Sequence, residues 1–316
     1  KKEVISAIGW CIMEEMSVQP GPSLTVISAV WMISVHISFK MWRKQKMTEI
    51  IVDYFDLEQI CESGQCFRMK RKSEHQYEVI AGDRYLQISQ KGNQICFDCT
   101  SEEYEGFWKR YFDLETDYGN FIQRIDPGDS YLMEAARFGS GIRILKQDLW
   151  EMIVSFLISQ QNNIRRIRRC IEAICEKYGE KKRNKAGDIY YAFPKPEAFA
   201  GLGEDDLKKC NLGYRSKYVV RTARMTADAE VDLQKIERSS YPEAKEELMR
   251  FYGVGSKVAD CICLFALGQM EAFPVDTHIN QALQKHYPGG FPMEAYPGFQ
   301  GILQQYIFYY ELMGGK

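Results

Sequence analysis

The chain has 316 residues, which suggests about two domains, because a single hydrophobic core rarely grows past roughly 250 residues. Its composition is 45% hydrophobic and 27% charged, which is typical of a folded protein and excludes a disordered one. The 41 basic and 43 acidic side chains give a net charge of −2, which excludes nucleic-acid binding by bulk charge but leaves room for a local basic face.

Ten cysteines are spread along the chain. In a chain of this length with a normal core they do not resemble a disulfide framework, so we interpret them as reduced thiols of an intracellular protein, mostly packed in the core. Cys96 and Cys99 make one C-x-x-C pair, but no second pair follows at the spacing of a zinc site. We therefore favour core packing over metal binding for this pair.

The first 46 residues form an extension of doubtful status. Residues 23–39 are mostly apolar, but this run is short for a membrane span, which needs about 20 residues, and no clear signal-peptide cleavage site is present. Residues 40–46 are basic. A membrane anchor, a folded helix and upstream sequence outside the working protein are three competing interpretations, and we favour the last.

Residues 47–140 are predicted to form a small antiparallel sheet domain. Gly82-Asp83 separates the strand-like runs 76–80 and 84–89, which is a hairpin signal. A second turn, Gly92-Asn93, precedes another short strand at 94–98. Helical spacing then returns over residues 102–112.

From residue 141 to residue 316 the pattern predicts a second, all-helical domain. Residues 148–161 place apolar side chains on one helical face, and a second helix over 164–178 is expected to stop at Gly179. Further helices are predicted over 196–199, 205–210, 216–227 and 242–252. The expected fold class is therefore α+β, with a small antiparallel sheet followed by helices.

The sharpest signal is a Gly-Val-Gly turn at residues 253–255 between two predicted helices. Gly253 and Gly255 permit positive φ angles, and Ser256 can cap the second helix. The amides of such a hairpin and the positive end of the helix point at one anion, which makes a phosphate cradle. Taken alone, the same pattern is also a plain turn between packed helices.

Two neighbouring residues add chemistry to the turn. Lys257 lies in the first turn of the new helix, on the same face as Cys261, and the helix dipole there favours the uncharged amine that a nucleophile requires. Asp276 can cap the following helix, which begins near His278, and a capping carboxylate is held ionised, ready to stabilise a cationic sugar transition state. The plainer alternatives are a solvated lysine and a structural cap.

Gly-Val-Gly-Ser-Lys-Val-Ala-Asp, followed about twenty residues later by Pro-Val-Asp-x-His, resembles the helix-hairpin-helix DNA glycosylase superfamily, and more narrowly the 8-oxoguanine DNA glycosylases. The resemblance extends over nearly the whole chain after Met47. Four further blocks occur in the right order: SGQCFR at 63–68, SFLISQQNNI at 155–164, LGYRSKY at 212–218 and GILQQYIF at 301–308.

The resemblance implies a bifunctional DNA glycosylase and abasic-site lyase of base-excision repair. In this interpretation Lys257 attacks the sugar C1′ and forms a Schiff base, which permits strand cleavage on the 3′ side by β-elimination. Asp276 stabilises positive charge at the sugar and helps to activate the amine.

The resemblance also implies a lesion pocket. The carbonyl of Gly64 would accept the N7–H that only the oxidised base carries, whereas guanine would place a lone pair against it. Cys261 and Phe308 would sandwich the purine, and Gln304 would read its Watson–Crick edge. Taken singly, each of these residues is also compatible with ordinary packing or a satisfied amide.

A base inside a duplex cannot reach such a pocket, so the enzyme must extrude it and fill the gap. In the family an asparagine at the position of Gln161 enters the duplex. Gln161 here, with Asn162 next to it, leaves open which side chain enters. Tyr214 matches the family's wedge aromatic, and Arg166 and Arg215 match two arginines that contact the orphaned cytosine with their donor forks.

Phosphate contacts are implied at two further places. His278 matches a family position that touches phosphate, and Gly253, Gly255 and Val258 would offer backbone N–H groups to another phosphate, directly or through a structural cation. Residues 162–185 contain nine Lys or Arg and three Glu, a local net charge of +6 that suits a DNA-facing surface. A solvated helix face is the alternative.

We expect the protein to work without a cofactor. Endonuclease III and the adenine-mispair glycosylases carry four cysteines after the catalytic Asp for an iron–sulfur cluster, and no cysteine follows Cys263 here. Alkyl-base glycosylases keep the Asp but lack the Lys, so Lys257 argues against them.

The expected partner is double-stranded DNA containing 8-oxoguanine, bound by a monomer with no obligatory protein partner. The expected location is the cytoplasm of a bacterium, at the nucleoid, or the nucleus of a eukaryote. Two other classes stay open: a non-catalytic DNA-binding scaffold, and a protein tethered to a membrane through residues 23–39.

Overall fold

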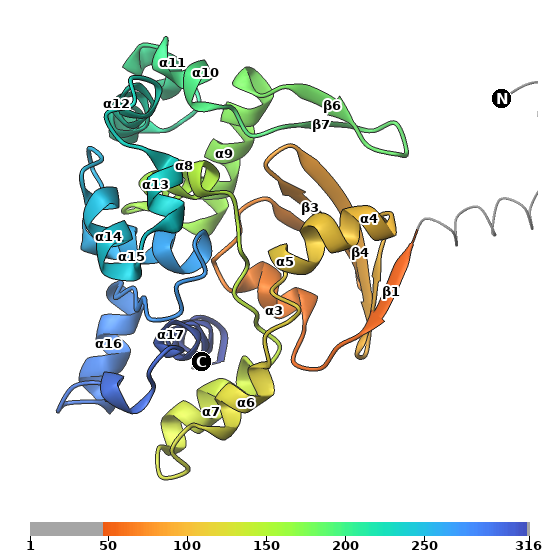
Figure 1. Cartoon of the computed structure of the whole chain (residues 1–316), viewed down its shortest axis with the longest axis vertical. Coiled ribbons are helices and arrows are strands. Elements are labelled where there is room, and N and C mark those ends of the chain that lie inside the picture. Colours follow the sequence, from red (N-terminus) through yellow and green to blue (C-terminus); the bar gives the residue numbers. More distant parts are fainter. Residues whose placement is uncertain (1–46, 315–316) are drawn as a thin grey trace, which may run out of the picture. The chain divides into compact units, whose positions relative to one another are not determined.

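The computed structural model describes residues 47–314, and those from residue 48 onward belong to one compact unit (Figure 1). The three interpretations of residues 1–46 lie outside the described residues. Among residues 47–314, no helix combines the length and the apolar character needed to cross a membrane.

The N-terminal part contains a five-stranded antiparallel sheet in the order β1-β5-β4-β3-β2. Its strands are β1 (Thr48–Ile51), β2 (Met69–Ser73), β3 (Gln76–Ala81), β4 (Arg84–Lys91) and β5 (Gln94–Phe97). The predicted hairpin is confirmed, since Ala81 pairs with Arg84 and Gly82 takes a φ of +58°. The second predicted turn is confirmed by the pairing of Lys91 with Gln94.

One face of the sheet is buried because its strands alternate apolar and polar side chains. Val79, Leu86 and Ile95 have no exposed surface and pack in one cluster with α3 (Leu57–Glu62). The helix predicted over 102–112 is confirmed, but it is built from α4 (Ser101–Glu103), a π-helical turn η1 (Tyr104–Trp108) and α5 (Lys109–Tyr111).

The rest of the described chain is mainly helical, which confirms the α+β fold class. Its helices are α6 (Tyr118–Gln123), α7 (Ser130–Phe138), α8 (Leu149–Ser159), α9 (Ile164–Tyr178), α10 (Pro196–Ala200), α11 (Glu204–Lys208), α12 (Ser216–Ala227), α13 (Leu233–Arg238), α14 (Tyr241–Met249), α15 (Ser256–Phe265), α16 (Thr277–His286) and α17 (Gln300–Tyr309), with 3-10 turns η2 (Gly213–Arg215) and η3 (Met293–Ala295) and a π-helical turn η4 (Tyr310–Gly314). Although α6 and α7 precede residue 141, their apolar side chains join the core of these helices, and the division at 140/141 stays a prediction.

A short hairpin, β6 (Lys181–Arg183) with β7 (Ile189–Tyr191), follows α9 and reaches to the sheet (Figure 1). The sequence did not suggest these strands, because they are three residues long and mostly charged or exposed. Lys182 pairs with Asp83 at 2.6 Å, and Phe193 N–H donates to the Gly82 carbonyl at 2.9 Å. The hairpin therefore holds the sheet against the helices.

A buried ion pair joins the same two parts of the fold. Arg68, beside β2, lies 3.7 Å from Glu151 on α8, and the two side chains are 7% and 6% exposed. Glu151 also accepts a hydrogen bond from the Gly82 N–H at 2.9 Å, and Arg68 donates to the Gly82 and Tyr191 carbonyls. These contacts fix the segment between α3 and β2, which contains Gly64.

Candidate active site

Lys257 and Asp276 line one small pocket with a volume of about 60 Å³. The rest of its wall consists of Ser63, Gly64, Phe156, Cys261, Phe265, Pro274, Gln304, Gln305 and Phe308. The amine, the carboxylate and the four residues of the predicted lesion pocket, which are far apart in the sequence, therefore meet at one place.

The hairpin that precedes α15 depends on Gly253. Its φ is +92°, and a Cβ added there would lie 2.7 Å from Cδ1 of Tyr218, so both conformation and space require glycine. The prediction of a positive φ at Gly255 is wrong: its φ is −98° and it forms the N-cap of α15. Ser256 is accordingly the first helical residue and not the cap. The preceding helix ends at Met249, three residues earlier than predicted.

Lys257 lies in the first turn of α15, as predicted, with its Nζ 5.8 Å from the ring centroid of Phe156. Cys261 follows one turn later. Burial raises the pKa of the Cys261 thiol to about 11, and the positive charge of Lys257 only partly opposes this effect. Cys261 is thus a neutral thiol at pH 7, which suits it as an apolar wall and not as a second nucleophile.

Asp276 is the N-cap of α16, which confirms its predicted structural role. Its Oδ1 accepts a hydrogen bond from the Ile279 N–H at 2.9 Å. The cap holds the carboxylate at the start of a helix while the residue lines the pocket. One carboxylate can therefore serve the fold and the site.

The far wall of the pocket is formed by Gly64 and by α17. Gly64 takes a φ of +75° after the end of α3, and a Cβ there would lie 3.0 Å from Cε1 of Phe308. Gln304 is 4% exposed, and its Oε1 is buried without a hydrogen-bond partner. A buried amide oxygen left unpaired is costly, so its presence in a pocket wall indicates a ligand that donates to it. His278 lies beside this wall, with its ring 6.1 Å from that of Phe308.

The loop predicted to fill the DNA gap connects α8 and α9. Gln161 is exposed, takes a φ of +47° and receives a hydrogen bond from the Tyr214 hydroxyl on its Oε1 at 3.3 Å. Asn162 is instead tied to the backbone: its Nδ2 donates to the Ile158 carbonyl at 3.0 Å, and its Oδ1 accepts from the Asn163 N–H. Tyr214, the predicted wedge, is 44% exposed. Gln161 and Tyr214 are thus both exposed and are joined by a hydrogen bond.

The two arginines assigned to the orphaned cytosine differ in their surroundings. Arg166 is exposed on the first turn of α9 and donates to the Asn211 carbonyl at 3.3 Å. Arg215 is only 3% exposed, and its guanidinium donates to the carbonyls of Gln160 and Gln161. Arg215 therefore holds the backbone of the α8–α9 loop in this structure.

The basic run 162–185 divides into two groups. Arg168, Lys182 and Lys185 form ion pairs with carboxylates of the sheet domain. These cations serve to hold the hairpin and α9 on the sheet. The arginines of the first turns of α9 follow directly after the α8–α9 loop and are the better candidates for contact with DNA.

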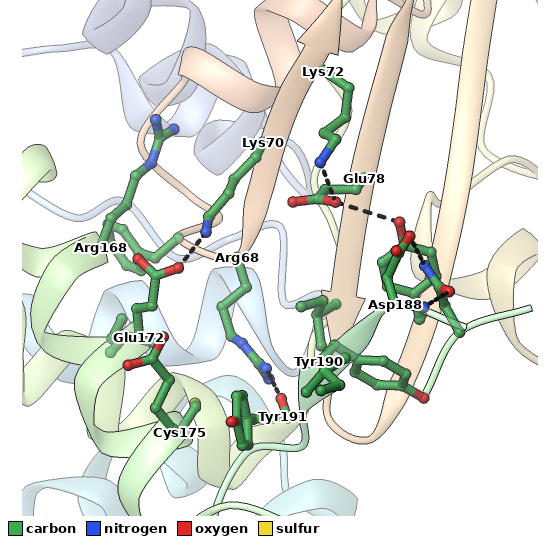
Figure 2. A pocket seen from close by; sticks show the side chains of 17 residues that line it. Arg68, Lys70, Lys72, Glu78, Arg168, Glu172, Cys175, Asp188, Tyr190 and Tyr191 are labelled. Carbon is green, nitrogen blue, oxygen red and sulfur yellow. Dashed lines mark hydrogen bonds and ion pairs between the residues drawn. The ribbon is translucent and has the colours of Figure 1, made fainter. Parts of the chain in front are cut away.

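A larger cleft of about 310 Å³ lies elsewhere, between the sheet, α9 and the β6–β7 hairpin (Figure 2). Its charges are largely paired with each other: Lys70 contacts Glu172 at 2.6 Å, and Lys72 contacts Glu78 at 3.2 Å. It shares no residue with the Lys257 pocket. Within residues 47–314, no group of three or more His, Cys, Asp or Glu side chains could hold a metal ion.

The sequence analysis did not identify two residues that contribute to this region. Gln160 donates from its Nε2 to the Gly253 carbonyl at 3.0 Å and so joins the α8–α9 loop to the hairpin. Gln305 is 2% exposed and donates to the Ser63 carbonyl. The signal that could have found Gln305 is a pair of adjacent glutamines in the middle of a mostly apolar helix, since a buried amide requires a partner.

Comparisons with known proteins agree with this arrangement. The family model described as 8-oxoguanine DNA glycosylase, N-terminal domain, matches residues 47–153, and the one described as HhH-GPD superfamily base excision DNA repair protein matches residues 154–290. The N-glycosylase/DNA lyase of Saccharomyces cerevisiae is 33% identical over 190 residues, and the match spans 56% of this chain and 50% of the yeast protein. The probable N-glycosylase/DNA lyase of Methanothermobacter thermautotrophicus is 32% identical, over 60% of this chain and 64% of its own.

A solved structure is similar over more of its length. It is the 8-oxoguanine glycosylase/lyase of Clostridium acetobutylicum in complex with double-stranded DNA that contains cytosine opposite 8-oxoguanine. The two chains are 35% identical, with a TM-score of 0.79, and the match covers 86% of this chain and 97% of the clostridial one. With this relative and the two family models in sequence order, the chain belongs to the 8-oxoguanine DNA glycosylases of the helix-hairpin-helix (HhH-GPD) superfamily.

Proposed function

We propose that the protein is a bifunctional DNA glycosylase and abasic-site lyase of base-excision repair, which excises 8-oxoguanine from duplex DNA, with cytosine as the preferred opposite base. The observation that carries the proposal is the pocket shared by Lys257, Asp276 and the unpaired amide oxygen of Gln304. An amine, a carboxylate and a polar group for reading a base are the parts that this reaction requires.

In the proposed mechanism the uncharged amine of Lys257 attacks C1′ of the extruded nucleotide. The C1′–N9 bond breaks, and the base leaves with the bonding electrons and takes up a proton. One amine proton balances the one taken up by the base. The C1′–O4′ bond then breaks, O4′ takes up the other amine proton, and a Schiff base remains between Nζ and C1′. The Asp276 carboxylate stabilises the positive charge that develops at the sugar.

The Schiff base then permits strand cleavage. A proton leaves C2′, and the C3′–O bond breaks with its electrons passing to the departing 3′ phosphate. Hydrolysis of the Schiff base returns the free amine of Lys257. Each step uses groups of this chain and water, so the proposal includes no redox cofactor and no iron–sulfur cluster.

Recognition is assigned to the other walls of the pocket. The carbonyl of Gly64 accepts the N7–H of 8-oxoguanine, while Cys261 and Phe308 enclose the purine ring. Gln304 reads the Watson–Crick edge, and its buried Oε1 without a partner supports this role. A substrate that lacks the matching donor would leave buried polar groups unpaired, which is the physical basis of discrimination.

The duplex is assigned to the surface around the α8–α9 loop. Gln161 fills the gap and Tyr214 acts as the wedge, because both are exposed and hydrogen-bonded to each other, whereas Asn162 is tied to the backbone. Arg166 and Arg215 contact the orphaned cytosine. Arg215 does so after its guanidinium releases the carbonyls of Gln160 and Gln161.

The phosphates of the duplex are assigned to the hairpin and to α16. Gly253, Gly255 and Val258 present backbone amides to one phosphate, directly or through a cation, and His278 contacts another. The proposed active form is a monomer without an obligatory protein partner, located where the DNA is, in the cytoplasm or the nucleus.

The amine is tested by trapping with borohydride, which reduces a Schiff base to a stable protein–DNA adduct. The wild-type protein is expected to form the adduct on duplex with 8-oxoguanine opposite cytosine. Lys257→Gln is expected to form none and to lose both activities while it still binds the duplex. Lys285→Gln, which changes an exposed lysine on α16, is the matched control and should trap like the wild type. A wild-type protein that releases base but never traps would refute the lyase mechanism.

The substrate is tested with a panel of duplexes that carry 8-oxoguanine opposite each of the four bases, together with an alkylated base and an unmodified control. Fastest release of 8-oxoguanine opposite cytosine is expected. Binding of damaged duplex without release of any base would identify a non-catalytic scaffold and would overturn the enzyme assignment.

A further inference from the structure

We propose that Gln305 is a positioning residue for lesion recognition, because it fixes the peptide that leads into Gly64. This inference rests on the proposed function, in which the Gly64 carbonyl distinguishes 8-oxoguanine from guanine. The juxtaposition that carries it is the hydrogen bond from Gln305 Nε2, at the centre of α17, to the carbonyl of Ser63.

Gly64 needs a restraint from outside. It is the first residue after the C-cap of α3, its φ is +75°, and glycine can turn its own carbonyl more freely than any other residue. A carbonyl that is to read one N–H must instead keep a fixed direction, because hydrogen bonds weaken steeply with angle. The direction of the adjoining Ser63 carbonyl, and with it the Ser63–Gly64 peptide plane, is set by Gln305.

The surroundings of Ser63 leave little freedom. Ser63 is 1% exposed, and its hydroxyl donates to the Ile60 carbonyl at 2.9 Å and accepts from Gln65 Nε2 at 2.9 Å. These bonds hold the side chain, whereas the bond from Gln305 holds the backbone carbonyl. Loss of that donor would leave a buried carbonyl unpaired, and the peptide would turn to find another partner.

The same helix supplies the other contacts of the base-reading wall. Gln304 precedes Gln305, and Phe308 packs its Cε1 within 3.0 Å of where a Cβ of Gly64 would lie. Gln304, Gln305 and Phe308 all line the pocket. One turn of α17 therefore sets the positions of the amide that reads one edge, the ring that covers the face, and the peptide that leads into Gly64, whose carbonyl reads N7–H.

The test compares two duplexes that differ only at the N7 donor, one with 8-oxoguanine and one with its 7-deaza analogue, in which carbon replaces N7. Dissociation constants are measured in a Lys257→Gln background, so that no base is released. The background protein is expected to prefer 8-oxoguanine. Adding Gln305→Met, which keeps the length but removes the donor, is expected to reduce this preference by about tenfold, the effect of about 1.4 kcal/mol for one hydrogen bond.

Gln305→Glu makes the preference for 8-oxoguanine depend on pH, which a purely structural role of Gln305 would not do. At high pH its carboxylate repels the Ser63 carbonyl, but once protonated it donates a hydrogen bond, so the preference should return as the pH is lowered. Gln269→Met is the matched control, since Gln269 Nε2 also donates to a backbone carbonyl, that of Ser239 at 2.9 Å, on a residue that is not part of the pocket wall. This control should leave the preference unchanged.

The outcomes separate the two proposals. If Gln305→Met keeps the full preference for the N7–H donor, or weakens binding of both duplexes equally, Gln305 does not position Gly64 for reading N7–H. If the background protein itself shows no preference for 8-oxoguanine, the proposed recognition by Gly64 fails, and the inference about Gln305 fails with it.

Discussion

The Asp276 carboxylate accepts a hydrogen bond from the Ile279 N–H and also lines the pocket, so its structural and chemical roles can be separated by substitution. Asp276→Asn keeps a capping oxygen but removes the charge, and it is expected to change the free energy of unfolding by less than about 1 kcal/mol. Base release should fall about 100-fold or more, because the variant has no carboxylate aimed at the developing positive charge. Asp276→Ala should add about 1 kcal/mol of destabilisation because it removes the cap.

The measurements for Asp276 are urea unfolding and single-turnover release of 8-oxoguanine. If Asp276→Asn releases base at the wild-type rate, the carboxylate only caps α16 and the proposed charge stabilisation is wrong.

The sequence predicted those features of single residues that depend only on their neighbours in the chain. The cap at Asp276 and the helical start of Lys257 were predicted because each depends on a few neighbouring residues. The conformation of Gly255 and the cap at Ser256 were predicted wrongly, since either glycine of the hairpin can carry the turn and packing against Tyr218 selects Gly253. Contacts such as Gln305 with Ser63 were not predictable, because they join residues 242 positions apart.

At the scale of elements, the first turns of α9 are expected to contact the DNA backbone, whereas the β6–β7 hairpin is expected to hold the fold together. Arg165 and Arg169 lie four residues apart and are exposed. Replacing both by Ala should lower the slope of log binding constant against log salt by about 0.9 for each phosphate that the protein no longer neutralises. Lys182→Ala, the control in the hairpin, should leave that slope unchanged, since Lys182 pairs with Asp83.

Fluorescence anisotropy over a series of salt concentrations checks this prediction. A slope that stays the same in the Arg165 and Arg169 double variant would assign those arginines to a solvated helix face.

The helices α9 and α12 were predicted with the bounds that the structure shows, because long amphipathic periods are strong signals. The β6–β7 hairpin lacks any such period.

At the scale of the whole molecule, the buried pair of Arg68 and Glu151 makes stability depend on pH. Burial raises the pKa of Glu151 from 4.5 to about 7, although Arg68 opposes the shift. Between these two values the folded protein keeps the proton while the unfolded chain has released it. Stability should therefore fall as the pH rises from about 4.5 to about 7, by on the order of 3 kcal/mol, and stay level above that range.

Glu151→Gln is expected to remove this part of the pH dependence, since its amide does not titrate and can still accept from the Gly82 N–H. Urea unfolding of both proteins at pH 5, 6, 7 and 8 gives the comparison. The difference in free energy of unfolding, wild type minus variant, should decrease across the window. A difference that stays constant would show that Glu151 has the same ionisation in the folded and unfolded states.

The pocket draws its walls from opposite ends of the described chain: Gly64 follows the first helix of the sheet domain, and Lys257 begins a helix near the C-terminus. On the proposed assignment, the carbonyl that reads N7–H and the reactive amine thus come from different parts of the chain. A fragment reduced to the later helices would keep the amine but lose the group that tells 8-oxoguanine from guanine. Because the fold brings both into one pocket, the amine meets a sugar only where the attached base has been checked for N7–H.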